Sequence, residues 1–268
     1  MRWIALVLGL FVSTGAAASP CLAFVQSWPG SVRVAQLGGS QPVTTAAPVT
    51  TIRYIGHSTF RIETPGGVVI ATDYFGAAGP GPVPDVVTMN HAHETHYTDY
   101  PDPAITHVLR GWKTGGRAEH FVTVEDVLVR NVPTDLRSFG FEADGNSIFV
   151  FEIGELCIGH LGHLHHEPSE QHYAAIGRLD VVMAPVDGTW TLNIGQMINV
   201  LKRLKSRIVL PMHAFSAQGL AFFLDGMSDE FEIRFSQEST LEVATDRLPA
   251  RPTVVVLPTR LAAGDPDE

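Results

Sequence analysis

The stretch NHAHETHYTDY, residues 90–100, places His91, His93 and His96 within six positions. It follows the apolar segment DVVTM (85–89), which is typical of a buried strand. On a helix, side chains two positions apart point about 200° away from each other, whereas in an extended or looped segment they project to the same side. The spacing therefore predicts a loop at a strand end, in which His91 and His93 can share one cation and His96 can face another.

Histidines also follow two other predicted strands. The segment GHLGHLHH (159–166) comes after a strand predicted over 155–159, and His213 comes after one predicted over 207–211. Imidazole is the usual zinc ligand in proteins and also suits iron and nickel. Three histidine-bearing strand ends therefore predict a metal site at one edge of a sheet.

The surrounding pattern predicts an α/β sandwich. Three strand-like segments, 50–55, 59–63 and 68–72, come in succession with a Pro65-Gly66-Gly67 turn, which indicates an antiparallel meander. The second half alternates buried strands with helices, and Glu232 and Leu241 mark segments expected to close a sheet edge. The further predicted strands are 107–109, 121–130, 147–153 and 180–184, and the predicted helices are 169–176, 193–204 and 217–224.

The N-terminus has the pattern of an export signal. A basic start, the apolar run Ile4–Val12 and the small residues Ala16–Ala18 predict a signal peptide over 1–18. No other segment approaches the ~20 apolar residues that span a bilayer, so we expect an exported, periplasmic or secreted protein with no membrane attachment after cleavage. The remaining divisions are an extended leader over 19–48, one domain over 49–247 and a flexible tail over 248–268.

Composition narrows the partners. The chain is 45% hydrophobic and 17% charged, which is typical of a globular protein. Its net charge of −10, from 18 basic and 28 acidic residues, disfavours binding to nucleic acid or anionic lipid. Cys21 lies in the predicted leader and Cys157 in an apolar strand, so we expect two unpaired or buried thiols and no contribution of disulfides to stability.

At the histidine-bearing strand ends the chain resembles the metallo-β-lactamase superfamily, and within it the branch of ascorbate-6-phosphate lactonase-like hydrolases. The resemblance runs from about Thr51 to His213. It rests on several motifs in order, which are Tyr54–Phe60 (YIGHSTF), Ala71–Asp73 (ATD), His91–His96 (HAHETH), Asn146–Val150 with His160–Gly162 (HLG), Ala184–Gly188 (APVDG) and Pro211–His213 (PMH).

The resemblance implies a four-layer αββα sandwich with a metal pair at one edge. Carried over from the family, His91 and His93 hold one ion, and His96 and His213 hold the other. The sequence departs from the family pattern at Thr95 and at position 163, where the family has aspartates, and at 132–136, where it has a histidine. Our hypothesis is that His163 replaces the missing imidazole, so that His91, His93 and His163 surround one ion and the second position is weak or empty.

Thr95, Asp73 and His160 are the candidates for catalytic or supporting roles. Asp73 either orients a ligand histidine or closes a turn, and His160 either packs beside the site or ligates. Asp99 and Asp135 are replacement carboxylates or solvated loop acids. The other histidines have open roles: His57 lines the pocket or supports a strand end, and His165, His166 and His172 flank the pocket or are simply exposed.

These residues predict a hydrolase in which a metal activates water against a small ester, lactone, amide or phosphoester. The expected cofactor is Zn²⁺, one ion or two, with iron or manganese as alternatives. The lost aspartates favour a second interpretation, an exported metal-binding or sensing protein without turnover. A metal-dependent (β/α)₈ barrel also begins with HxH after a strand, but it needs eight strand–helix repeats rather than an early meander.

Overall fold

Strand-forming residues with alternating burial begin at Thr50 and build the first of two sheets. The computed structural model describes residues 19–22, 46–137 and 140–258, so the predicted signal peptide and most of the leader lie outside the described residues. The strand order is β13–β1–β2–β3–β4–β5, with bounds Thr240–Val243, Thr50–Gly56, Thr59–Glu63, Val69–Ala71, Val86–Met89 and His107–Arg110. Strands β1, β2 and β3 pair antiparallel, which confirms the predicted meander, and β3, β4 and β5 pair in parallel.

The second sheet has eight strands in the order β12–β14–β11–β10–β9–β8–β7–β6. The segment predicted as one strand over 121–130 is a hairpin that turns at Glu125, where φ is +47°. The bounds in sheet order are Glu232–Phe235, Thr253–Val256, Ile208–Met212, Val181–Pro185, Leu156–His160, Glu142–Ile153, Val127–Leu136 and Phe121–Val124.

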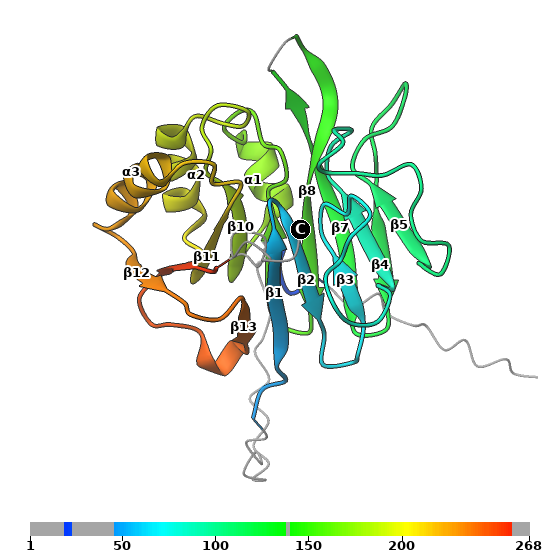
Figure 1. The fold of residues 1–268 in the computed structure, drawn as a ribbon, viewed down its shortest axis with the longest axis horizontal. Coiled ribbons are helices and arrows are strands. Elements are labelled where there is room, and N and C mark those ends of the chain that lie inside the picture. The colour runs from blue at the N-terminus through cyan, green and yellow to red at the C-terminus, as the bar shows by residue number, and fades with distance from the viewer. Residues whose placement is uncertain (1–18, 23–45, 138–139, 259–268) are drawn as a thin grey trace, which may run out of the picture.

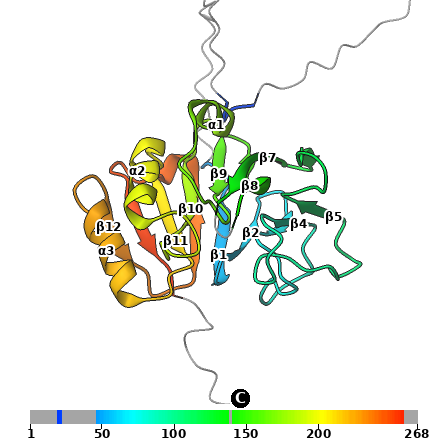
Figure 2. The same cartoon turned by 90° about the horizontal axis from the view of Figure 1, so that it is seen from above.

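The two sheets pack face to face around one hydrophobic core, which confirms the α/β sandwich (Figures 1 and 2). Phe60 and Ile62 from the first sheet contact this core from one side, and Phe149 and Phe151 from the second sheet contact it from the other. Packing of the two sheets removes their inward side chains from water, which is the main stabilising contribution.

Three α-helices, α1 (Glu170–Ile176), α2 (Ile194–Leu204) and α3 (Ala217–Met227), cover the outer face of the eight-stranded sheet. A 3₁₀ helix, η1, spans Thr245–Arg247. Among the described residues, the outer face of the six-stranded sheet is covered by loops around Tyr74, Tyr97 and Trp112 rather than by a helix. Over the ranges 19–22, 46–137 and 140–258, no helix is long and apolar enough to cross a membrane.

The prediction of a flexible tail over 248–268 is wrong for part of that segment, which forms a strand of the second sheet. Thr253–Val256 forms β14, which pairs in parallel with both β11 and β12. Its β-branched run Thr253-Val254-Val255-Val256 suits a buried strand, although prolines on both sides hide the pattern. Residues 259–268 lie outside the described part.

The prediction of unpaired thiols is wrong, because Cys21 and Cys157 form a disulfide with an S–S distance of 2.06 Å. The segment 19–22 lies against the second sheet, since the Ser19 hydroxyl donates to Glu152 Oε1 at 2.8 Å and the Arg178 N–H donates to the Cys21 carbonyl at 2.8 Å. The partners are separated by 136 residues in sequence. Only the folded backbone brings them together.

Parallel pairing places three strand ends at one edge. Strands β9, β10 and β11 run side by side, so the residues that follow them lie near one another. The loop after β4 joins this edge from the other sheet, because His91 forms an isolated antiparallel bridge with Asn146 of β8. Residues from both sheets therefore meet there.

Candidate metal centre

The loop after β4 is fixed at its first residue. The Asn90 N–H donates to Asp73 Oδ1 at 2.9 Å, and the Asn90 side-chain amide donates to the Ser147 carbonyl at 2.7 Å. The loop then turns tightly, with the His96 N–H donating to the His93 carbonyl at 2.7 Å. This turn presents His91, His93 and His96 at the sheet edge, as their spacing predicts.

All five predicted metal ligands lie in one cluster, and His163 is at its centre. The His163 ring centroid is 4.8 Å from that of His96, 5.2 Å from that of His91 and 5.5 Å from that of His213. His93 is further out, at 6.2 Å from His163 and 5.9 Å from His96. The cluster therefore joins the loops after β4, β9 and β11.

His57, in the turn between β1 and β2, also belongs to this cluster. Its ring centroid is 4.3 Å from that of His213 and 5.1 Å from that of His96. One nitrogen from each of His57, His96 and His213 lies within 4.8 Å of the others, a spacing at which the three rings could hold a metal ion. The backbone φ of His57 is +53° and that of His213 is +56°, an unusual conformation for non-glycine residues that aims both rings at one point.

Two buried carboxylates orient two of these rings. Asp73 Oδ2 lies 2.7 Å from His96 Nδ1, and Asp187 Oδ1 lies 2.8 Å from His213 Nδ1. A proton on each Nδ1 satisfies the carboxylate and leaves the Nε2 lone pair available, as in metal-binding histidines with a carboxylate behind them. Both contacts thus prepare the opposite side of the ring to bind a cation.

The residues present fit a metal ion at this position. The Nε2 atoms of His57 and His96 are buried, and within the described residues neither has a hydrogen-bond partner. A buried nitrogen without a partner costs about 1–3 kcal/mol, and a cation bound at the centre of the three rings would satisfy both atoms. We call His57, His96 and His213 the inner triad.

The other three rings form a more open group, which we call the outer triad: His91, His93 and His163. His91 Nδ1 lies 3.2 Å from the Gly145 carbonyl, so this nitrogen donates and Nε2 is left available. His93 Nδ1 contacts the Thr95 hydroxyl at 2.9 Å, and His163 Nδ1 contacts His165 Nε2 at 2.8 Å. His93 is exposed and His163 is buried. In the described residues the outer triad therefore has no carboxylate behind its rings.

Burial keeps several of these imidazoles in their neutral, ligand form. It lowers the pKa of His57 to about 4, with the nearby charge of His213 as a second cause. Burial, together with the charges of neighbouring imidazoles, also holds the pKa values of His96 and His163 well below their usual range. Neutral imidazole is the form that coordinates metal.

The two supporting carboxylates differ in their surroundings. Burial alone would raise the pKa of Asp187, but hydrogen bonds from His213, Thr191 and two backbone N–H groups lower it well below its usual range. Burial raises the pKa of Asp73, against the opposing effect of His160 and the Asn90 N–H. A divalent cation on the far side of His96 would favour the ionised form of Asp73.

His160 has a structural place rather than the catalytic place considered from the sequence. It is fully buried, its Nε2 lies 2.8 Å from the Ser58 carbonyl, and its Nδ1 accepts from the Gly162 N–H at 3.1 Å. Nε2 therefore joins the end of β9 to the turn between β1 and β2, and Nδ1 holds the start of the loop that follows β9. Nothing is left with which His160 could bind a metal.

Thr95 lines the cavity and Asp73 lies behind His96, so both are at the site. Asp99 is exposed, and Asp135 accepts from the Asp144 N–H at 3.2 Å, so neither replaces a missing carboxylate. His165 contacts His163. His166 and His172 lie beside each other, with ring centroids 5.7 Å apart, and His166 Nε2 accepts from the Asp135 N–H.

Two site residues, Asp187 and His57, were not among the predicted metal ligands or catalytic candidates, although His57 was considered as a residue that lines the pocket. Asp187 follows β10 as His213 follows β11, so the rule that ligands gather at parallel strand ends could have indicated it. His57 lies in a motif used for the resemblance, but its contact with His213 depends on the packing of the two sheets. Sequence distance gives no signal of that contact.

The cluster opens into a cavity of about 460 Å³, which we call the histidine cavity. Trp190 and Phe215 are 53% and 54% exposed, and both lie at this cavity. The lining residues are His57, His91, His93, Thr95, His163, Trp190, His213 and Phe215.

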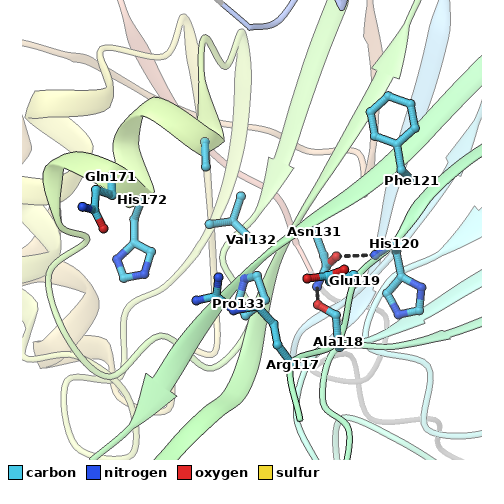
Figure 3. A pocket seen from close by; sticks show the side chains of 11 residues that line it. Arg117, Ala118, Glu119, His120, Phe121, Asn131, Val132, Pro133, Gln171 and His172 are labelled. Atoms are coloured by element: carbon cyan, nitrogen blue, oxygen red, sulfur yellow. Dashed lines mark hydrogen bonds between the residues drawn. The ribbon is translucent and has the colours of Figure 1, made fainter.

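A second cavity of about 550 Å³, the α1 groove, lies between α1 and the strands β6 and β7 (Figure 3). His172 and Gln171 of α1 lie across from Val132 and Pro133 of β7. The lining residues are Arg117, Ala118, Glu119, His120, Phe121, Asn131, Val132, Pro133, Gln171, His172 and Ala175. The groove is slightly larger than the histidine cavity, but its polar groups do not converge, so we place the functional site at the histidine cavity.

Comparison with known proteins finds a family model, relatives in sequence and solved structures of similar fold. A family model described as the beta-lactamase superfamily domain matches residues 51–213. A protein named a metal-dependent hydrolase from Salinibacter ruber is 24% identical over 210 residues, which cover 68% of this chain and 92% of the relative. Another so named, from Pyrococcus abyssi, is 25% identical over 189 residues, which cover 60% and 83% of the two chains.

Among solved structures, a Thermotoga maritima protein assigned to the Zn-dependent hydrolases of the metallo-beta-lactamase superfamily is similar. It is 26% identical, has a TM-score of 0.57, and the match covers 78% of this chain and 98% of that one. The part of the chain matched by the family model, residues 51–213, contains the sheet edge at which the histidines meet.

Proposed function

Because the chain belongs to the beta-lactamase superfamily domain family, we propose that it is a metal-dependent hydrolase of a small-molecule ester, lactone, amide or phosphoester. The observation that carries the proposal is the inner triad. The buried Nε2 atoms of His57 and His96 have no hydrogen-bond partner in the described residues, and His213 is held beside them by Asp187. Burying these nitrogen atoms without partners costs free energy, and a cation bound between the three rings would offset that cost.

The proposed ligands differ from those expected from the sequence. The inner triad is the stronger position, because its rings are more buried and two of them have carboxylates behind them. The outer triad would hold a second ion more weakly. His163 lies between the two positions, 4.8 Å from His96 and 5.2 Å from His91 by ring centroid, so it could serve either ion.

The donor atoms favour zinc. Each triad offers only imidazole nitrogen, and no carboxylate is among the residues that line the cavity. Nitrogen ligands suit zinc, and also iron, copper and nickel, whereas manganese prefers oxygen donors. We therefore propose Zn²⁺ as the resident ion, with iron as the alternative and manganese less favoured.

When bound, the cation would supply Lewis acidity and lower the pKa of water toward neutrality. The chain itself orients the groups: Asp73 and Asp187 fix the rings of His96 and His213, and the Asn90 contacts fix the loop that carries His91, His93 and His96. Thr95 provides a hydroxyl at the cavity wall, 2.9 Å from His93 Nδ1. There it can accept a hydrogen bond from the substrate or donate one to it.

We also propose that the protein is exported. The signal pattern at the N-terminus supports this proposal, and so does the Cys21–Cys157 disulfide, because such bonds persist in oxidising compartments. Cys21 follows the expected cleavage position by only a few residues. Cell fractionation with an antibody to the C-terminal part would test the localisation.

A metal-binding protein without turnover is the second candidate. It is favoured by Thr95 and His163, which stand where the resembled family has aspartates, and by the lack of a carboxylate among the cavity-lining residues. Without such a group, the described lining offers only imidazoles and one hydroxyl to move a proton. Turnover separates the two candidates.

The experiment measures metal content and hydrolysis on the same full-length protein purified from the exported fraction. Elemental analysis gives the stoichiometry, and p-nitrophenyl esters, lactones and phosphodiesters test turnover. His213→Gln should remove both metal and activity, whereas His172→Gln, in the α1 groove, should keep both. Bound metal without turnover of any substrate would favour the binding protein, and unchanged metal content in His213→Gln would contradict the site.

A further inference from the structure

Two aromatic side chains form the walls of the histidine cavity away from the rings of the inner triad. Phe215 lies against the metal-binding cluster, with its ring centroid 4.3 Å from that of His213 and 5.5 Å from that of His57. Trp190 contributes a second large surface. Both side chains are about half exposed, an unfavourable state for large apolar groups unless a ligand covers them.

The backbone holds both aromatic residues in place. The Trp190 N–H donates to Asp187 Oδ2 at 2.6 Å, and the Thr189 N–H donates to the same oxygen at 2.8 Å. Phe215 precedes Ser216, whose hydroxyl accepts from the Gly219 N–H at 3.0 Å and caps α3. Asp187 therefore links the position of Trp190 to that of His213, so the aromatic wall and the metal centre are built together.

The same cavity lacks a charged partner for an anionic substituent. Its lining residues, all within the described part of the chain, include no Lys, Arg, Asp or Glu. Arg110, on the strand that pairs with β4, is engaged elsewhere, because its Nη2 donates to the Thr98 carbonyl. An anionic group placed between Trp190 and Phe215 would lose water without gaining an ion pair from any side chain that lines the cavity.

We propose that the substrate's non-reacting part is an uncharged, apolar acyl or aryl group held by Trp190 and Phe215. The inference rests on the proposed hydrolase function and narrows its substrate class to neutral esters, lactones or amides with a hydrocarbon substituent. Phosphorylated sugars and other substrates that carry a remote anion are excluded. A volume of about 460 Å³ suits a small molecule of this kind.

A series of p-nitrophenyl esters tests the proposal on the zinc-loaded protein. From acetate to hexanoate, kcat/KM should rise about two- to fourfold for each added methylene, because each one is removed from water. The hemisuccinate ester, which ends in a carboxylate, should react at least ~10-fold more slowly than the neutral ester of equal length. A preference for the hemisuccinate would overturn the proposal.

Matched variants locate the effect. Trp190→Ala and Phe215→Ala should each lower kcat/KM for the hexanoate ester about 10- to 100-fold and flatten the chain-length series, with acetate changed much less. Phe121→Ala is the control, because Phe121 is an exposed aromatic residue in the α1 groove. If kcat/KM rises with acyl chain length as steeply in both cavity variants as in the wild type, Trp190 and Phe215 do not hold the acyl group.

A binding measurement separates failure of this inference from failure of the hydrolase proposal. Hexyl methyl ketone and the keto acid of equal length that ends in a carboxylate are titrated while tryptophan fluorescence is followed, with Trp190→Phe as reference. If no ester is hydrolysed but the ketone binds at least ~10-fold more tightly than the keto acid, the apolar site stands and the hydrolase proposal fails. If the keto acid binds as tightly or more tightly, the inference fails whatever the turnover.

Discussion

The histidine cavity and the α1 groove have similar volumes, about 460 and about 550 Å³, but they use their polar atoms differently. In the α1 groove, Asn131 donates to the Ala118 carbonyl, His120 Nε2 contacts the Arg110 carbonyl, and His172 Nδ1 accepts from the Ser169 N–H. These contacts hold loops and a helix end together. In the histidine cavity, two buried ring nitrogens have no partner among the described residues.

The comparison teaches that a functional site is indicated by buried polar atoms without hydrogen-bond partners rather than by the volume of a cavity. Imidazole nitrogens that are buried and oriented but left without partners raise the free energy of the folded state, and a bound ligand can offset this increase. Asp73 and Asp187 increase that readiness by engaging the opposite nitrogens. The α1 groove has histidines too, but their contacts already serve the fold.

Removing a ring of the inner triad should have the largest effect. His96→Gln and His213→Gln should each weaken zinc affinity by more than about 100-fold, because even loss of a supporting group costs about 10- to 100-fold. The same change at His172 should leave affinity unaltered. Competition with a chromogenic chelator measures this, and equal affinities in all three variants would remove the distinction between the cavities.

Changing the supporting carboxylates should have the next largest effect. Asp187→Asn and Asp73→Asn should each lower zinc affinity about 10- to 100-fold, since the amide holds the ring less firmly and carries no charge. Asp135→Asn is the matched control, because Asp135 contacts the Asp144 N–H outside the cluster. Calorimetric titration with zinc gives the affinities; a wild-type value for Asp187→Asn would show that His213 needs no support.

The disulfide should affect stability without affecting the metal. Cys21 is bonded beside the end of α1, since its carbonyl accepts from Arg178, so it anchors the side of the fold that bears the α1 groove. Cys157→Ser, and reduction of the wild type, should lower the free energy of unfolding by about 2–5 kcal/mol. Urea titration measures the loss. Zinc affinity of the native protein should stay within about twofold; a parallel loss of affinity would mean that the two regions are coupled.

Acid should destabilise the metal-free protein through the buried imidazoles. The pKa values of His57 and His165 are lowered to about 4, from an ordinary value of 6.5, chiefly by burial. Between these values the unfolded chain binds more protons than the folded chain, so the free energy of unfolding falls as pH falls from 6.5 towards 4. Urea midpoints at several pH values test this; midpoints that are constant across the window would show that these rings are solvated.

The smallest effect is expected in the α1 groove. Phe121→Ala and Arg117→Ala remove exposed side chains, so each should change the free energy of unfolding by no more than about 0.5 kcal/mol. Zinc affinity and ester hydrolysis should not change. A tenfold effect on either would show that the α1 groove contributes to function and that the comparison between the cavities is wrong.

The sequence by itself determined the family, the order of strands and helices over most of the domain, and the edge of the fold at which the histidines of the candidate site meet. The HxHxxH spacing required a loop after a strand, and the two further strand ends with histidines indicated where the other histidines of the cluster lie. These inferences succeed because side-chain direction in strands and loops depends on neighbouring residues, which the sequence displays directly.

Tertiary structure alone decided which side chains complete the site and close the fold. It brought His57 to His213, placed Asp187 behind His213, engaged both nitrogens of His160, and joined Cys21 to Cys157 across 136 residues. It also inserted Thr253–Val256 between two earlier strands. Each of these contacts joins residues far apart in the chain, so it depends on how the sheets pack and not on any local spacing.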